Sequence, residues 1–155
     1  MDYEKGLVEV ADEVHAYLQP EGGWGWSNAG LLVGHGASLL VDTLFDLNLT
    51  SEMLDAMTSV TVSCPIGTVV NTHANGDHCY GNQLVAGPGR RVVTTEAAAA
   101  EMSAVPPSLL TALVNSDLDE VTNRYVQEAF GAFDFSGIEV PEPDKIGRAS
   151  CRERV

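Results

Sequence analysis

The sequence predicts an α/β fold. Short runs in which apolar and polar residues alternate are separated by longer runs of helix-forming residues. Strands that alternate with helices along a chain are typical of domains in which helices pack on a sheet. With 155 residues, of which 45% are hydrophobic, the chain is long enough to bury one core, so we expect one domain.

The first elements are predicted to be strands. Residues 7–18 alternate well enough for one strand or a pair of strands, and residues 19–27 form a loop rich in turn-forming residues. Ala29–Val33 and residues 38–42 are predicted to form a hairpin. The glycines of residues 34–36 between them allow the positive φ angles of a tight turn.

A helix and a buried strand are predicted next. The helix should begin at Thr50 or Ser51, whose hydroxyl would cap its N-terminus, and should end near Thr58. Glu52 in the first turn favours this placement, because a carboxylate there faces the positive end of the helix dipole. Residues 68–71 form an apolar run that predicts a buried strand.

The second half of the chain is predicted to be mostly helical. Residues 79–84 should form a short helical turn, and Arg91–Thr95 the next strand. Helices are expected over residues 96–103 and 108–130, separated at residues 106–107, where two prolines cannot continue a helix.

The densest group of polar side chains lies in residues 71–82. Within six positions this segment places His73, Asn75, Asp77 and His78 directly after the predicted strand. Buried imidazole and carboxylate groups are costly unless they are paired or bound to a cation. Imidazole nitrogen and carboxylate oxygen are ligands of zinc, and also of iron and manganese. The segment therefore predicts a metal site.

The spacing of these residues indicates two sub-sites. In extended backbone, residues i and i+2 share a face, so His73 and Asn75 can converge on one point. Gly76 permits a sharp turn, after which Asp77 and His78 can face the same cavity. The alternative is structural: a core histidine, an Asn-Gly turn and a helix-capping aspartate would need no metal.

These residues resemble the signature of the metallo-β-lactamase fold superfamily, which is His-x-His-x-Asp-His after a strand, often followed by Gly-Asn. His73, Asp77, His78 and the pair Gly81-Asn82 match it. Asn75 stands where the family has its second histidine, which weakens the first sub-site. We therefore expect a single metal ion or two sites of unequal strength.

An upstream segment extends the resemblance. Residues 28–43 resemble the opening hairpin of the family, which ends in Asp-Thr, here Asp42-Thr43. The resemblance covers roughly residues 7–95. It implies an αβ/βα sandwich with metals held by loops at one edge of the sheets, of which this chain would hold the N-terminal half.

The resemblance implies a metal-dependent hydrolase. In this family a metal-bound hydroxide attacks an ester, thioester, lactone or lactam type of substrate, and phosphate or sulfate esters are further candidates. His73 would hold the first of one or two zinc ions, with weak help from Asn75. Asp77 and His78 would hold the second, or Asp77 would act in catalysis by orienting the nucleophilic water. Iron or manganese could replace zinc. A non-catalytic binding or scaffold domain is the alternative.

Two tryptophans are candidates for substrate binding. Trp24 and Trp26 lie among glycines in a loop, where large aromatic side chains are poorly placed to build a core. In the resembled family a loop at this position often overhangs the active site. We expect these side chains to contact substrate, with packing on the protein's own surface as the alternative.

The last eleven residues differ from the rest. Residues 145–155 carry four of the eight Lys and Arg residues and resemble the translation of a sequencing-adapter read-through. We expect residues 1–144 to be the N-terminal part of the domain and the tail to be non-native; a basic tail that binds an acidic partner is the alternative. No histidine follows His78, so we expect an incomplete site, weak metal binding, no activity and an uncovered sheet face.

The charge and the cysteines limit the partners and the compartment. The formal net charge is -14, and about -17 without the basic tail, which argues against nucleic acid or an anionic membrane as a partner. A small-molecule substrate is expected. Cys64 and Cys79 have no disulfide-framework spacing, which favours a reducing compartment. Without a visible signal peptide or a long apolar run, a cytoplasmic protein is expected.

Overall fold

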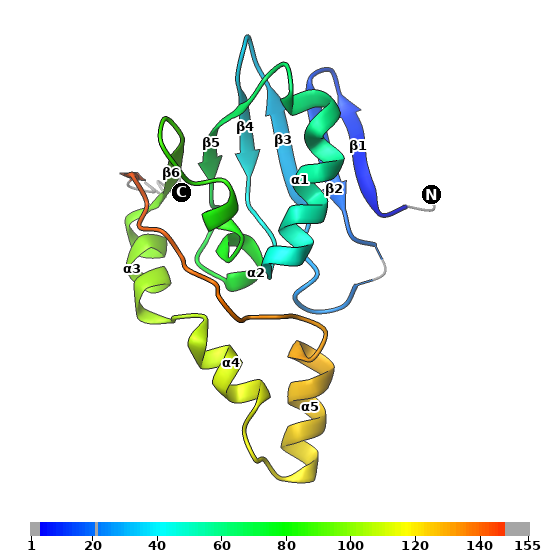
Figure 1. Ribbon diagram of the computed structural model, residues 1–155, viewed down its shortest axis with the longest axis vertical. Helices are drawn as coiled ribbons and strands as arrows, with labels where there is room; N and C mark the ends of the chain where they lie inside the picture. The colour runs from blue at the N-terminus through cyan, green and yellow to red at the C-terminus, as the bar shows by residue number, and fades with distance from the viewer. Residues whose placement is uncertain (1–3, 21, 148–155) are drawn as a thin grey trace, which may run out of the picture.

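The computed structural model describes residues 4–20 and 22–147. Within them the chain forms one seven-stranded sheet whose spatial order follows the sequence, from β1 at one edge to β7 at the other. Helices lie against this sheet and extend beyond one end of it, as Figure 1 shows. The predicted α/β class is confirmed.

The first part of the sheet is antiparallel. β1 (Gly6–Ala11), β2 (Val14–Leu18), β3 (Ala29–Val33) and β4 (Ser38–Val41) pair in succession. Residues 7–18 thus form a pair of strands, and the predicted β3–β4 hairpin is confirmed.

The second part of the sheet is parallel. β5 (Ile66–Val70) pairs with β4, β6 (Arg91–Thr95) with β5, and β7 (Lys145–Gly147) with β6. The strand predicted over residues 68–71 begins two residues earlier, and the one predicted at Arg91–Thr95 is confirmed. β7 is the start of the segment expected to be non-native; residues 148–155 lie outside the described residues.

Helix α1 (Leu47–Thr61) begins earlier than predicted from the sequence. Its N-cap is Asp46, whose carboxylate accepts the backbone N–H of Leu49 at 2.7 Å. The predicted cap at Thr50 or Ser51 is wrong, because the Thr50 hydroxyl instead donates to the carbonyl of Asp46 at 2.8 Å within the first turn.

The two faces of the sheet differ in their cover. One face packs with α1 into the core, in which Leu31, Leu40, Met53, Met57 and Val69 are fully buried. Strand register places Val8 and Leu32 on the opposite face, where each is 42% exposed. The sheet therefore has one open, partly apolar face, as expected for a single layer of a two-sheet sandwich.

Three helices lie between β6 and β7: α3 (Glu96–Ala104), α4 (Ser108–Val114) and α5 (Glu120–Phe130). The prediction for residues 96–103 is confirmed, but the single helix over 108–130 is wrong. The chain leaves the helical conformation between α4 and α5. Asp119 then caps the N-terminus of α5, because its carboxylate accepts two backbone N–H groups of the first turn. In Figure 1, α4 and α5 extend away from the sheet.

Among the described residues, no single helix is long and apolar enough to cross a membrane. Only the pair α3 and α4, bent by 45° at their junction, reaches the required length and composition.

Candidate metal centre

The segment that carries the predicted ligands follows β5 and is held by a pair of buried asparagines. The Asn71 side chain donates to the carbonyl of His78 at 2.8 Å, and the Asn82 amide donates to the Asn71 side-chain oxygen at 2.8 Å. These bonds fix α2 (Gly76–Cys79) against the end of the strand. Of the helical turn predicted over residues 79–84, the structure forms α2 and a short 3₁₀ turn at Asn82–Leu84.

Asp42 connects this segment to the neighbouring strand. It directly follows β4, is 4% exposed and has a positive φ of 62°. Its carboxylate accepts the backbone N–H of Thr72 at 2.7 Å and the Thr72 hydroxyl at 2.8 Å. A third contact joins Asp42 Oδ2 to His78 Nδ1 at 2.9 Å. Asp42 is thus the buried carboxylate that holds the ligand segment.

No role was predicted for Asp42 from the sequence. It was expected only as part of the Asp-Thr pair that ends the hairpin. The available signal was an aspartate directly after a buried strand, a residue type that tolerates positive φ and can accept several backbone hydrogen bonds.

His78 has both ring nitrogens facing carboxylates. Nδ1 lies 2.9 Å from Asp42, and Nε2 lies 3.4 Å from Asp77 Oδ2. The hydrogen bond to Asp42, helped by that to Asp77, raises the pKa of His78 to about 9 against the effect of burial. In the neutral ring, the hydrogen-bond network favours a proton on Nδ1, which donates it to Asp42. The Nε2 lone pair then points toward Asp77.

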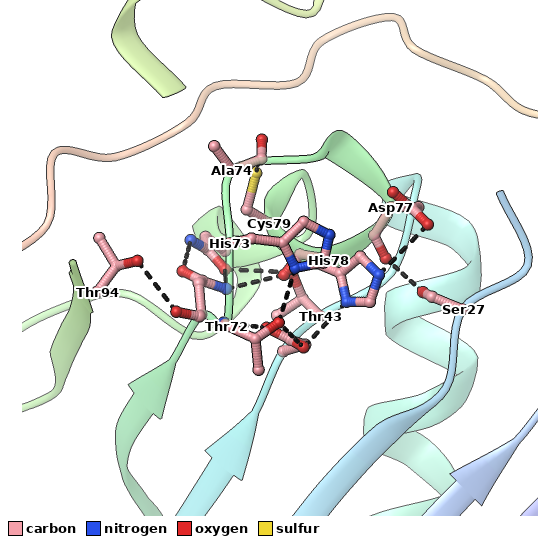
Figure 2. A network of polar contacts seen from close by, with 12 residues as sticks. Ser27, Thr43, Thr72, His73, Ala74, Asp77, His78, Cys79 and Thr94 are labelled. Atoms are coloured by element: carbon pink, nitrogen blue, oxygen red, sulfur yellow. Dashed lines mark hydrogen bonds and ion pairs between the residues drawn. The ribbon is translucent and has the colours of Figure 1, made fainter. Parts of the chain in front are cut away.

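Asp77 and His73 complete the cluster around His78. Burial opposes ionisation of Asp77, but the hydrogen bond and charge of His78 outweigh it, so the pKa of Asp77 is lowered. The ring of His73 lies beside that of His78, with centroids 4.1 Å apart, and its Nδ1 is 2.8 Å from the Thr72 hydroxyl. Figure 2 shows the two rings and Asp77 grouped above the ends of the strands.

Asn75 is placed differently. It is the exposed residue before α2, and its backbone carbonyl accepts the N–H of His78 at 2.9 Å. The structure therefore gives Asn75 a role in shaping the turn into α2. The Ser27 hydroxyl fixes the same turn by donating to the carbonyl of Asp77.

The donor chemistry fits a metal ion, but the number of donors does not complete a site. An imidazole nitrogen facing a carboxylate oxygen is a ligand pair that zinc, iron and manganese accept. Across residues 4–20 and 22–147, no group of three or more His, Cys, Asp or Glu side chains is placed to hold a metal ion. A catalytic zinc needs three protein ligands, so the described residues provide part of a centre.

Cys79 directly follows His78 and is buried beside the cluster. It is fully buried, its thiol donates to the Ala74 carbonyl at 3.5 Å, and burial raises its pKa to about 12. Cys64 and Cys79 are both free cysteines.

The two tryptophans have separate surroundings. Trp24 is 60% exposed and lines a pocket of about 200 Å³ together with Asn75 and Asp77. Trp26 packs on Phe133, with ring centroids 5.1 Å apart, and lines a different cavity. Only Trp24 therefore lies next to the candidate metal centre.

The raised pKa of His78 gives a prediction for the metal-free chain. A group whose pKa is higher in the folded state contributes stability that is fully present below its unfolded value and is lost as the pH rises through its folded value. The free energy of unfolding should thus fall between about pH 6.5 and about pH 9. Urea denaturation at a series of pH values measures it.

The control is His78→Gln, in which this fall should be smaller. The exposed His35 provides a matched variant, His35→Gln, which should keep the fall of the parent chain. A parent chain and a His78→Gln variant with the same pH dependence would contradict the Asp42–His78 pairing.

Comparison with known proteins identifies the family. The family model of the metallo-beta-lactamase superfamily matches residues 22–147, most of the chain. The chain belongs to the metallo-β-lactamase superfamily, and the predicted fold family is confirmed. No curated protein matches the chain by sequence.

Several solved structures share the fold. The inverting sec-alkylsulfatase Pisa1 from Pseudomonas sp. has a TM-score of 0.58 at 20% identity, over 70% of this chain and 18% of its own. A metallo-beta-lactamase from Pontibacter korlensis has a TM-score of 0.56 at 21% identity, over 65% of this chain and 48% of its own. FIM-1 from Pseudomonas aeruginosa, in a mono-zinc form, has a TM-score of 0.51 at 20% identity, over 66% and 47%.

These coverages define the extent of the match. The chain spans about half the length of the two metallo-β-lactamases and less than a fifth of the sulfatase. At these identities the similarity shows the fold.

Proposed function

We propose that the chain supplies part of the metal centre of a metal-dependent hydrolase that acts on a small molecule. The observation that carries this proposal is the orientation of His78 between two carboxylates. Asp42 holds Nδ1 at 2.9 Å while Nε2 faces Asp77. A buried carboxylate on one nitrogen of a histidine is the usual support for a metal ligand on the other.

Each residue of the cluster has a task in this proposal. His78 and Asp77 would hold one ion, and His73, with weak help from Asn75, would hold another. A bound zinc ion lowers the pKa of water toward ~7 and polarises a carbonyl or ester oxygen, and iron or manganese are the alternatives. Asp42 keeps His78 in the tautomer whose Nε2 can bind. If no ion is bound by His78 and Asp77, Asp77 can accept a hydrogen bond from the attacking water and orient it.

The proposed substrates are esters, thioesters, lactones or lactams. Family membership and the hydrolases among the structural neighbours support hydrolysis as the reaction class. The net charge of -14 supports a small-molecule substrate over nucleic acid or an anionic membrane. Among the described residues, Cys64 and Cys79 are free, which supports a reducing compartment such as the cytoplasm.

A non-catalytic binding or scaffold domain is the second candidate. Asn75 in place of the second histidine and the incomplete ligand set favour it. Such a domain would keep the Asp42–His78 bond as internal support and would take up no metal.

Metal uptake separates the two candidates. Titration calorimetry of the chelator-treated chain with zinc should give about one equivalent of weak binding, at His78 and Asp77, because the described residues supply fewer than three ligands and the sub-site of His73 and Asn75 is the weaker of the two. His78→Gln should abolish the uptake, and His35→Gln should preserve it.

Two outcomes would count against this account. The absence of uptake of zinc, iron or manganese would contradict the hydrolase proposal and support the scaffold domain. Hydrolysis of an ester or lactam above background by the zinc-loaded chain would contradict the inference that this chain's site is incomplete.

A further inference from the structure

A pocket of about 200 Å³ opens directly beside the candidate metal centre. One wall is the ligand segment itself, at Asn75, Gly76 and Asp77. The other walls come from the β2–β3 loop, from Phe45 shortly before α1, and from helices α3 to α5, which in Figure 1 lie below the end of the sheet. A molecule in this pocket would therefore touch the ligand segment.

Aromatic rings that contact one another form a further wall of the pocket, the aromatic wall. Trp24 meets Phe130 edge-on with centroids 4.9 Å apart, and meets Phe45 edge-on at 5.6 Å. Phe45 is 2% exposed, whereas Trp24 is 60% exposed. Edge-to-face contacts of this kind hold rings in a defined orientation. The ring of Trp24 is thus held in a defined orientation where it lines the pocket.

The ligand segment packs closely on this aromatic wall. A Cβ atom on Gly76 would lie 2.6 Å from the ring of Tyr80 and 2.9 Å from that of Phe45. Only a residue without a side chain leaves room for that approach. The aromatic wall and the proposed metal ligands are therefore held next to each other by direct contact.

The charges around the pocket are of one sign. In the described part of the chain, its charged lining residues are Asp77 and Glu101, both acidic. The rest of the lining is largely apolar and includes Val105 on the α3–α4 connection and Leu110 on α4. An anionic group would be repelled by the two carboxylates, whereas an uncharged apolar group would bury ring surface without that cost.

We propose that this pocket binds an uncharged alkyl or aryl group of the substrate and so selects substrates that carry one next to the bond that is broken. The proposal rests on the proposed function, because it takes the adjacent cluster as the reacting centre. The substrate would place its apolar group between Trp24, Leu110 and Phe130, with the reacting bond toward Asp77. A substrate with a carboxylate in place of that group would be selected against.

Trp24 provides a direct measurement of binding. The chain has two tryptophans, so Trp26→Phe leaves Trp24 as the sole source of tryptophan emission, and phenylalanine keeps a ring against Phe133. Benzyl alcohol and benzoate are the probes, titrated with chelator present so that no metal takes part. We expect a saturable change in Trp24 emission with benzyl alcohol, and binding of benzoate at least fivefold weaker. Glu101→Gln should reduce that difference.

Two neighbouring leucines of α4 provide the matched control. Leu110 lines the pocket, while Leu109 is 55% exposed elsewhere on the helix. Leu110→Ala should weaken benzyl alcohol binding at least threefold, and Leu109→Ala should leave it unchanged. Val105→Phe is a second test, because Val105 is 49% exposed and a larger side chain there fills the pocket without disturbing the core. It should also weaken binding.

The proposal is overturned if benzyl alcohol gives no saturable change in Trp24 emission or if benzoate binds as tightly as benzyl alcohol. It is also overturned if Leu109→Ala and Val105→Phe have the same effect on the affinity for benzyl alcohol. Because the titration contains no metal, its result is separate from that of zinc uptake. Failure of probe binding with zinc uptake intact refutes the pocket alone. Failure of zinc uptake with probe binding intact refutes the proposed reaction.

Discussion

Replacing Asp42 with asparagine should lower the zinc affinity of the chain by about 10- to 100-fold, the usual effect of losing the carboxylate that supports a histidine ligand. Asparagine has nearly the same shape and also tolerates the positive φ of 62° at this position. Its amide can still accept the N–H of Thr72, but its NH₂ group then faces His78 Nδ1. That nitrogen must become an acceptor, so the proton moves to Nε2, which can no longer bind a metal.

The same substitution should reduce stability. Asp42 is 4% exposed, and its bond to His78 is charge-assisted. Hydrogen bonds to charged groups contribute about 1.5–3 kcal/mol, so a loss of about that size is expected in urea denaturation. Zinc affinity is measured by titration calorimetry at a temperature at which both proteins are folded.

Asp46→Asn is the matched control for Asp42→Asn. Asp46 is also a buried carboxylate, 3% exposed, but it caps α1 and accepts the backbone N–H of Asp134 at 3.1 Å. Asparagine is a good N-cap through its one amide oxygen, but its NH₂ group cannot accept the N–H of Asp134, so a loss of about 1–3 kcal/mol in stability is expected. Zinc affinity should not change. Equal losses of affinity in the two variants, or no loss in Asp42→Asn, would contradict the assigned role of Asp42.

Replacing Gly81 with alanine should lower the free energy of unfolding by about 3 kcal/mol, the upper end of the usual range for overpacking. The backbone at Gly81 has φ -81° and ψ -1°, which any residue adopts. The loss of stability therefore comes from a steric clash and not from backbone strain. A Cβ atom would lie 2.0 Å from Thr50 Oγ1 and 2.7 Å from Thr50 Cβ.

Neither side of this contact can move freely. Thr50 is fully buried, and its hydroxyl donates to the Asp46 carbonyl at 2.8 Å and accepts the N–H of Leu44 at 3.2 Å. On the other side, a shift of Gly81 would pull Asn82 away from Asn71 and so loosen the segment that carries His78. Urea denaturation measures the loss, and a reduced zinc affinity should accompany it.

Gly67→Ala is the control for this substitution, because a Cβ there would meet only the Ala37 side chain at an ordinary 3.8 Å. It should change stability by no more than about 0.5 kcal/mol. Combining Gly81→Ala with Thr50→Ala should cost less than the sum of the two single changes. Strict additivity would show that the Thr50 contact is not the cause.

Much of the fold could be predicted from the sequence, because local patterns encode it. Alternation of apolar residues gave β1 and β2, and a glycine turn gave the β3–β4 hairpin. The start of α1 was missed because a buried aspartate, Asp46, does the capping that an exposed hydroxyl could have done. The break between α4 and α5 was missed although residues 115–119 are rich in Asn, Ser and Asp.

Only the part of the candidate site that lies within one short segment of the chain could be predicted from the sequence. His73, Asp77 and His78 lie within one short segment, so spacing alone could group them. Asp42 is 36 positions from His78, and only the pairing of β4 with β5 brings them together. The pocket depends on α4 and α5 in the same way, since no local pattern places Phe130 against Trp24.

We infer that a metal ion binds His78 through Nε2 while Asp42 holds Nδ1. The most direct test is a long-range ¹H–¹⁵N spectrum of the imidazole groups of the four histidines, recorded before and after zinc is added to the chelator-treated chain. We expect zinc to shift the Nε2 resonance of His78 and to leave its Nδ1 protonated, with His15 and His35 unchanged. Imidazole resonances that stay in place at saturating zinc, or a His78 that loses its Nδ1 proton, would contradict it.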